Sequence, residues 1–239
     1  MNKTCFNDRT AIAACVAGEP RTFRDVSTRM HHSISLLRPD LYMAIAVSAY
    51  SNFSADPLCP VATHVATTPK TNVLRKSHMA HTMVSCAAMI QQGEYTRGSR
   101  YEWILRMRTD VYYDFNWVSS PIPAQVRTVW SNYIGGCYTC AKHQRHCIND
   151  EWNILPRIAL ETFFVKFYEE YSARFPFQGS LSSCPECRLG WILWKNGFER
   201  QNVSVNIPII RAGMQLPSRK YSLFPRLSLQ RVVSGLGVF

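Results

Sequence analysis

The sequence predicts an α/β fold in which a mostly parallel central sheet is flanked by helices. Short apolar runs indicate buried strands, amphipathic segments between them indicate helices, and proline or glycine stands at most of the boundaries. The chain has 239 residues, of which 46% are hydrophobic, so it can bury one substantial core. The absence of repeats and low-complexity tracts excludes a solenoid and a disordered chain.

The first half of the chain alternates strands with helices. The strands expected there are 10–18, 41–47, 61–65 and 103–107. Residues 25–37 carry apolar residues three or four apart, which predicts an amphipathic helix that Pro39 stops. A second helix is expected from Pro69, a favourable first helical position, to Gly93.

The second half is expected to continue the same sheet. A strand is predicted at 126–130, a short extended piece at 149–155 and a last strand at 203–210. Pro156 is predicted to open one helix, and Ser183 another that Gly197 closes.

The formal net charge of +11 comes from 27 basic and 16 acidic residues. Such a balance is typical of nucleic-acid binding, but the basic residues are scattered and form no dense run. Arginine exceeds lysine, and its planar fork suits two-point contacts with phosphate. A small phosphorylated ligand therefore fits the composition as well as a polynucleotide does.

Residues 101–110, with the sequence YEWILRMRTD, predict a buried strand that carries charge near its end. Alternation places Arg106, Arg108 and Asp110 on one face of this strand. Buried charges need partners, so one interpretation is a structural Arg–Asp pair near the edge of the sheet. The other is that Asp110 ligates Mg²⁺ or Mn²⁺ while an arginine supports the phosphates of a ligand.

The turn after the first strand is a second candidate for ligand binding. Ligands of open α/β sheets bind beyond the carboxyl ends of the strands, where Gly18 and Glu19 lie. Gly18 permits close approach of the backbone, and Arg21 could hold a phosphate. A plain structural turn is the alternative, and no G-x-G-x-x-G motif is present.

Two adjacent acids, Asp150 and Glu151, precede the extended piece in the second half. A carboxylate there could act as general base on a hydroxyl, or Asp150 could simply cap a turn.

Two C-x-x-C pairs offer a possible structural zinc site of four thiolates, formed by Cys137, Cys140, Cys184 and Cys187. Disulfides and separate free thiols are the alternatives. The second pair also has the C-P-x-C form of thiol oxidoreductases, in which Cys184 and Cys187 would do redox chemistry.

The order of these segments resembles the nucleotide-sugar glycosyltransferases of the GT-A type. The likeness is to poorly characterised glycosyltransferase-like proteins of algae, plants and large DNA viruses. It is carried by residues 16–23, 101–111, 149–157 and 185–197. The cysteine pairs lie outside this pattern.

The resemblance implies a single GT-A-like (Rossmann-like) domain over 10–211. Its nucleotide-binding half would be 10–118 and its acceptor half 119–211. Residues 1–9 would form an N-terminal extension and residues 212–239 a basic C-terminal tail.

The resemblance also implies roles for single residues. Asp110 would bind Mn²⁺ or Mg²⁺, and Asp150 or Glu151 would face the hydroxyl acceptor, which could be a glycan, a protein or a lipid. The nucleotide sugar would be bound by Gly18, Glu19, Arg21, Arg106, Arg108 and Asp110. Arg108 departs from the pattern, because it stands where a D-x-D motif has its first aspartate. Arginines in place of the metal, and an inactive family member, are the alternatives that this departure leaves open.

Other function classes stay open as well: a basic, zinc-stabilised module that binds nucleic acid, and a thiol oxidoreductase. No apolar run is long enough to span a bilayer, and residues 1–10 lack a signal-type apolar segment. We therefore expect a cytoplasmic protein, or one of the secretory lumen if a leader or anchor is missing.

Overall fold

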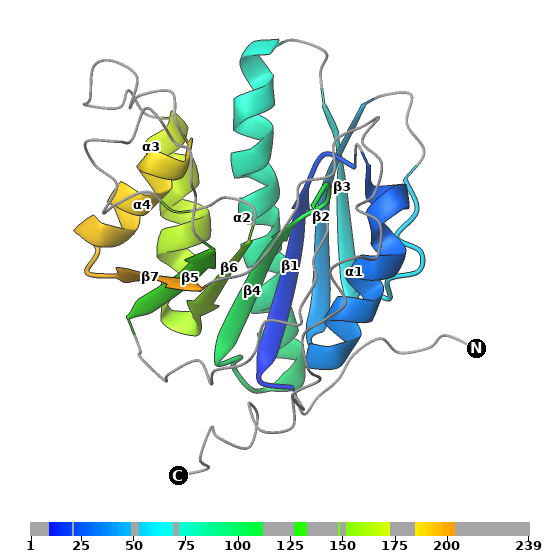
Figure 1. Cartoon of the computed structure of the whole chain (residues 1–239). Helices are drawn as coiled ribbons and strands as arrows, with labels where there is room; N and C mark the ends of the chain where they lie inside the picture. Colours follow the sequence, from blue (N-terminus) through cyan, green and yellow to red (C-terminus); the bar gives the residue numbers. More distant parts are fainter. Residues whose placement is uncertain are drawn as a thin grey trace.

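A computed structural model describes residues 10–20, 22–48, 53–68, 72–111, 127–132, 148, 152–172 and 185–203. Within this part of the chain a seven-stranded sheet has the strand order β3-β2-β1-β4-β6-β5-β7, and helices cover both of its faces (Figure 1). The predicted α/β class with a mostly parallel sheet is confirmed.

The strands of this sheet follow the predicted order along the chain. They are β1 (Ile12–Gly18), β2 (Asp40–Ser48), β3 (Ala62–Thr68), β4 (Trp103–Arg108), β5 (Thr128–Asn132), β6 (Trp152–Pro156) and β7 (Glu199–Val203). The helical elements are α1 (Phe23–Leu37), α2 (Asn72–Arg97), η2 (Arg157–Ala159), the π-helical η3 (Glu161–Lys166), α3 (Phe167–Ser172) and α4 (Pro185–Lys195).

One strand runs against the rest of the sheet. β6 is antiparallel to its neighbours β4 and β5, whereas the other strand pairs among the described residues are parallel. Consequently β1, β2, β3 and β4 bring their carboxyl ends to one edge, and the amino end of β6 joins that same edge.

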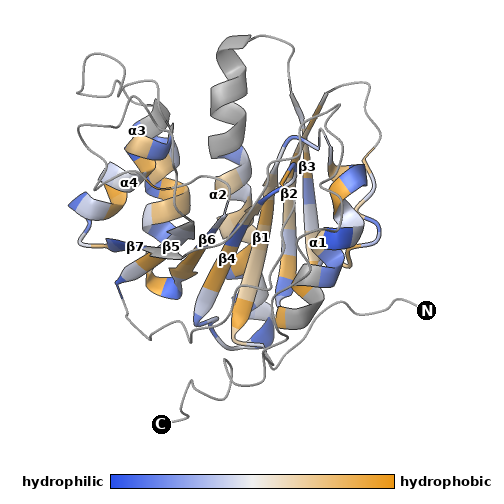
Figure 2. Cartoon of the chain, in the orientation of Figure 1, coloured by the Kyte–Doolittle hydropathy of each residue, from blue (hydrophilic) through white to orange (hydrophobic). Residues whose placement is uncertain are grey.

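The helix α1 covers one face of the sheet. Its apolar side, with Phe23, Val26 and Met30, packs on Val16 of β1 and Met107 of β4. These helix residues are three or four apart, which is the spacing that places them on one side of a helix. Figure 2 shows the result, with hydrophobic colour along β1 and β2 and a mixture of both colours on α1.

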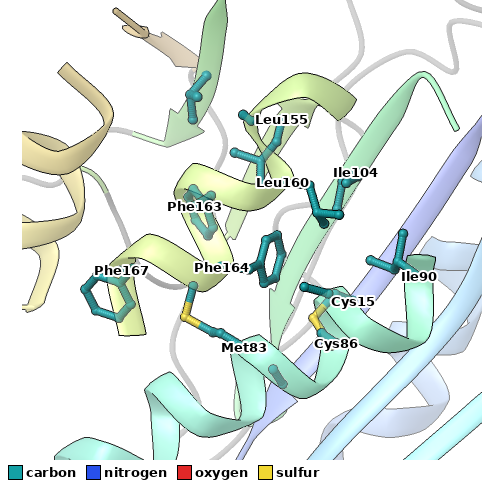
Figure 3. Close-up of a cluster of buried hydrophobic side chains, with 14 of the residues drawn as sticks. Cys15, Met83, Cys86, Ile90, Ile104, Leu155, Leu160, Phe163, Phe164 and Phe167 are labelled. Carbon is teal, nitrogen blue, oxygen red and sulfur yellow. A yellow bond between two sulfur atoms is a disulfide. The ribbon is translucent and has the colours of Figure 1, made fainter. Parts of the chain in front are cut away.

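The opposite face is covered by α2, η3, α3 and α4. Phe163 and Phe164 of η3 lie in a buried cluster with Ile104 of β4 and Met83 of α2 (Figure 3). A disulfide between Cys15 of β1 and Cys86 of α2 lies within this cluster and ties the helix to the central strand.

A buried polar network closes the amino-terminal edge of the sheet. The Tyr101 hydroxyl donates to Asp40 Oδ2 at 2.7 Å, so the Tyr42 hydroxyl, 2.8 Å away, must donate to the Tyr101 oxygen. Arg97 lies with its guanidinium 4.4 Å from the centre of the Tyr101 ring and 3.5 Å from Asp40 Oδ2. Burial raises the pKa values of both Tyr101 and Tyr42, because it disfavours the phenolate.

The same edge holds a two-point ion pair between α2 and η2. Arg157 donates through Nε to Glu94 Oε1 at 2.5 Å and through Nη2 to Glu94 Oε2 at 2.6 Å. Glu94 Oε1 also accepts from the backbone amide of Tyr101 at 3.1 Å. Glu94 therefore ties the end of α2 both to η2 and to the residues just before β4.

One predicted helix end is wrong, and one predicted helix start lies one residue before the observed one. The second helix does not end at Gly93 but continues to Arg97, and the chain turns only at Gly98, where φ is +69°. Gly93 is needed for another reason: a Cβ built there would lie 1.8 Å from the Tyr42 hydroxyl oxygen. Pro156 ends β6 in an extended conformation, and the helical run begins one residue later.

The strands at the far edge of the sheet are displaced from their predicted positions. β5 begins at Thr128, two residues later than predicted, and β7 begins at Glu199, four residues earlier. The cause of the second shift is the turn at Gly197 (φ +78°), which ends α4 and leads directly into β7. Residues 204–210 of the predicted last strand lie outside the described part of the chain.

Among the described residues there is no helix with the length and apolar character needed to cross a membrane. The boundaries predicted at 9/10, 118/119 and 211/212 stay predictions, since residues 9, 118, 119, 211 and 212 are not described.

Candidate functional site

The turns that follow β1 and β4 are joined at the carboxyl edge of the sheet. β1 and β4 are parallel neighbours, with Ala17 opposite Arg108. Beyond the last pair, the Thr109 hydroxyl donates to the backbone oxygen of Glu19 at 2.5 Å, although the two residues are 90 positions apart along the chain. The two segments that the sequence singled out therefore lie side by side.

Gly18 makes this contact possible. It has φ +143°, which side-chain-bearing residues rarely adopt, and a Cβ there would lie 3.1 Å from the Thr109 hydroxyl oxygen. The group that closely approaches the backbone at Gly18 belongs to a neighbouring turn of the protein itself, and the contact of Gly18 with a ligand stays a prediction.

Arg108 and Asp110 form a two-point ion pair in this place. Arg108 Nε donates to Asp110 Oδ1 at 2.8 Å, and Nη2 donates to Oδ2 at 2.7 Å. The side chains are 27% and 12% exposed, so solvent reaches the pair from one side. Of the two interpretations of the sequence, the Arg–Asp pair is thus present in the structure, and Asp110 lies in the turn rather than in the strand.

Arg106 lies deeper than the sequence indicated. Its exposed fraction is 1%, and it occupies the middle of β4 between Cys15 of β1 and Asn153 of β6. Ser131 of β5 is the next residue in the same row across the sheet, and both Asn153 and Ser131 are fully buried. Arg106 therefore belongs to a buried polar row that points to the helices of the α2 face, while Arg108 reaches the edge.

The entrance to β6 is at the same edge. Trp152, the first residue of β6, pairs with Met107, one residue before Arg108. The proposed acceptor residues Asp150 and Glu151 precede Trp152 directly in sequence but are outside the described residues, as is Arg21.

The four described cysteines, Cys15, Cys59, Cys86 and Cys187, are all disulfide-bonded. Cys187 lies buried in α4. A disulfide-bonded Cys187 has no thiolate to offer to the predicted zinc site. Of the three possibilities for Cys187, which were a zinc ligand, a disulfide and a free thiol, the structure contains the disulfide. Cys137, Cys140 and Cys184 lie outside the described part.

Sequence reasoning missed Thr109 and the Cys15–Cys86 bond. The sequence did contain a signal for Thr109. It stands between Arg108 and Asp110, so alternation directs its hydroxyl to the side opposite their charged side chains. No spacing rule pairs two cysteines that are 71 residues apart.

Within the described part of the turn after β4, residues 109–111, the carboxylate available to a divalent cation is that of Asp110. No group of three His, Cys, Asp or Glu side chains that could hold a metal occurs within the residues that the structure describes. Mg²⁺ commonly takes one or two carboxylates and completes its shell with water and ligand phosphates, so a single carboxylate fits the protein's share. Both oxygens of that carboxylate, however, accept hydrogen bonds from Arg108.

Comparison with known proteins gives little beyond these observations. No family model and no curated protein matches the chain. A similar solved structure is described as the crystal structure of a glycosyltransferase involved in the glycosylation of the major capsid of PBCV-1. The identity is 14%, the match covers 70% of this chain and 71% of that one, and the TM-score is 0.39. A match at this level says nothing of this chain's site residues or activity.

Proposed function

We propose that this chain is a glycosyltransferase that moves a sugar from a nucleoside-diphosphate sugar to a hydroxyl acceptor, assisted by Mn²⁺ or Mg²⁺. The observation that carries the proposal is the junction of the turns after β1 and β4. There the Thr109 hydroxyl bonds to the backbone oxygen of Glu19, and the guanidinium of Arg108 lies beside the carboxylate of Asp110. This junction is at the edge where open α/β sheets bind nucleotides. Two of the segments that resemble GT-A-type enzymes, residues 16–23 and 101–111, meet there.

In the proposed reaction, the bond between the sugar's anomeric carbon and the diphosphate oxygen breaks, and the electron pair leaves with the diphosphate. A bond forms between the anomeric carbon and the acceptor oxygen, whose proton passes to Asp150 or Glu151. Arg108 would bind the diphosphate and stabilise the negative charge that develops on it. A cation held by Asp110 would neutralise the same charge when bound.

The acceptor assignment depends on chain direction. Because β6 is antiparallel to β4, the chain enters β6 at the carboxyl edge of the sheet, where we propose that the nucleotide binds. Asp150 and Glu151 directly precede that entrance in sequence. A base for the acceptor hydroxyl is needed at this edge.

The proposal is tested by titrating UDP and GDP into the protein by calorimetry, with and without Mn²⁺, and by following donor hydrolysis with a panel of nucleotide sugars. We expect binding that Mn²⁺ strengthens, and we expect Asp110→Asn to abolish the Mn²⁺ effect. A wild-type protein that binds neither nucleotide in either condition would contradict the proposal.

The oxidoreductase alternative has its own measurement. If the Cys187 disulfide were catalytic, the protein would reduce or oxidise a dithiol substrate and Cys187→Ser would stop it, whereas a structural disulfide affects only stability.

A further inference from the structure

The ion pair of Arg108 and Asp110 uses the atoms that the proposed ligands need. The edge of the guanidinium formed by Nε and Nη2 is the edge that arginine commonly presents to a phosphate. In this structure that edge is directed at the two oxygens of Asp110, the carboxylate that the described part of this turn (residues 109–111) offers to a cation. The pair therefore competes with both ligands.

We propose that Arg108 and Asp110 pair with each other in the absence of ligand and exchange partners when the ligands bind. Arg108 then turns to the diphosphate and Asp110 to the divalent cation. The inference rests on the proposed function, in that it takes a nucleoside diphosphate and a cation as the ligands.

The partial exposure of the pair makes the exchange feasible. With 27% of Arg108 and 12% of Asp110 exposed, a ligand can approach from solvent and the separated charges are not left in a dry interior. The backbone at this point is held by the Thr109 bond to Glu19, so the side chains can part while the turn keeps its place.

The exchange has a thermodynamic consequence. Whichever ligand binds first must open the pair, and the second ligand then finds the contact between Arg108 and Asp110 already broken. Cation and diphosphate thus bind with positive coupling, and by linkage each raises the affinity for the other by the same factor. A permanently closed, purely structural pair would give no such coupling through these residues.

The chain contains a matched control at the opposite edge of the sheet. Arg157 and Glu94 form the same two-point geometry at 2.5 and 2.6 Å, with side-chain exposures of 20% and 8%. Arg157→Ala removes a pair of comparable burial and geometry far from the carboxyl edge. It therefore reports what general loss of an ion pair does to the protein.

The experiment measures Mn²⁺ alone, UDP alone and UDP with Mn²⁺ on the full chain by calorimetry. Arg108→Ala should raise the affinity for Mn²⁺ alone about fivefold, equivalent to about 1 kcal/mol, because the competitor is gone. It should also weaken UDP binding. Asp110→Asn should abolish Mn²⁺ binding and raise the affinity for UDP alone by a similar factor, and Arg157→Ala should change none of these affinities.

Arg108→Lys provides a second route if Arg108→Ala does not fold. Lysine keeps the charge but lacks the planar fork of arginine. Arg108→Lys should therefore also raise the affinity for Mn²⁺, by less than Arg108→Ala does. If both Arg108 variants leave the affinity for Mn²⁺ unchanged or lower it, the pair is a fixed structural one and the exchange is overturned.

The failure of the exchange is distinguishable from that of the proposed function. A wild-type protein that binds UDP equally well with and without Mn²⁺ overturns the exchange and leaves nucleotide binding intact. A wild-type protein that binds neither UDP nor GDP in any condition overturns the proposed function, and the exchange with it.

Discussion

Arg108 and Gly93 show what a single position can and cannot reveal. Alternation along β4 predicts that Arg108 and Asp110 share a side, but it does not say whether they bind each other or a ligand. The structure shows the pair at 2.7 and 2.8 Å. Gly93 resembles a helix terminator in sequence, yet it lies inside α2 because Tyr42 occupies the space where its side chain would be.

Gly93→Ala is expected to destabilise the protein, although alanine favours helix by about 1 kcal/mol over glycine. The added Cβ would lie 1.8 Å from Tyr42 Oη and 2.8 Å from Cζ, so one of the two elements must shift. Overpacking of this kind costs about 1–3 kcal/mol. Urea unfolding of wild type and variant measures the loss.

The double variant Tyr42→Phe/Gly93→Ala tests the cause. Removal of the hydroxyl relieves the nearest contact, so the glycine substitution should be less harmful in the Tyr42→Phe background than in wild type. Gln92→Ala on the exposed side of the same helix should change stability little. Equal losses from Gly93→Ala in both backgrounds would rule out this explanation.

At the scale of elements, the reversed strand β6 decides where the second half of the chain contributes to the site. Were β6 parallel to β4, residues 150 and 151 would precede the amino-terminal edge. Because it is antiparallel, Trp152 stands beside Met107 and the preceding residues connect to the carboxyl edge. The amino-terminal edge is instead closed by the network of Tyr101, Tyr42 and Asp40.

This network predicts a loss of stability in alkali. Unfolded tyrosine ionises near pH 10, whereas burial raises the pKa of Tyr101 and Tyr42 and keeps both protonated to higher pH in the folded protein. Above about pH 10 the unfolded state therefore binds fewer protons than the folded state, and the free energy of unfolding falls as pH rises. Below that pH the stabilising contribution is fully present.

Denaturant unfolding between pH 8 and 11 measures this slope. Tyr101→Phe lacks the ionisable group, so it should be less stable at every pH but should show a shallower decline above about pH 10. If Tyr101→Phe declines as steeply as wild type, other groups are responsible for the alkaline loss.

At the scale of the whole molecule, the Cys15–Cys86 disulfide joins the first strand to the long helix on its back. The bond encloses α1, β2 and β3, so it constrains the unfolded chain over a separation of 71 residues. Disulfides persist in oxidising compartments and are rare in the cytosol. The two compartments that the sequence left open, the cytoplasm and the secretory lumen, stay predictions.

The double variant Cys15→Ala/Cys86→Ala is expected to lose about 4 kcal/mol of stability, the entropic effect of a cross-link over a loop of this length. Thermal unfolding measures the change, and a double substitution avoids leaving one buried free thiol. Reductant should lower the melting temperature of wild type by more than that of the double variant. Mass spectrometry that finds Cys15 and Cys86 as free thiols in the purified protein would contradict the prediction.

Local patterns were enough for most elements but not for all. α1 and β1 follow from spacing within a few residues, and the meeting of the β1 and β4 turns follows from the rule for parallel strands. The position of β7 was missed because the strand follows directly on the turn at Gly197 and pairs with β5, a neighbour that is remote in sequence. The burial of Arg106 was missed for a similar reason, since it is produced by helices that pack over β4 from elsewhere in the chain.

The bridge between β1 and α2 also changes what proteolysis can do. A protease that cuts the backbone once between residues 15 and 86 leaves two fragments that stay covalently attached through sulfur. On a denaturing gel the nicked chain would migrate as one species without reductant and as two with it. On non-reducing gels alone, a cleaved molecule would therefore be mistaken for an intact one.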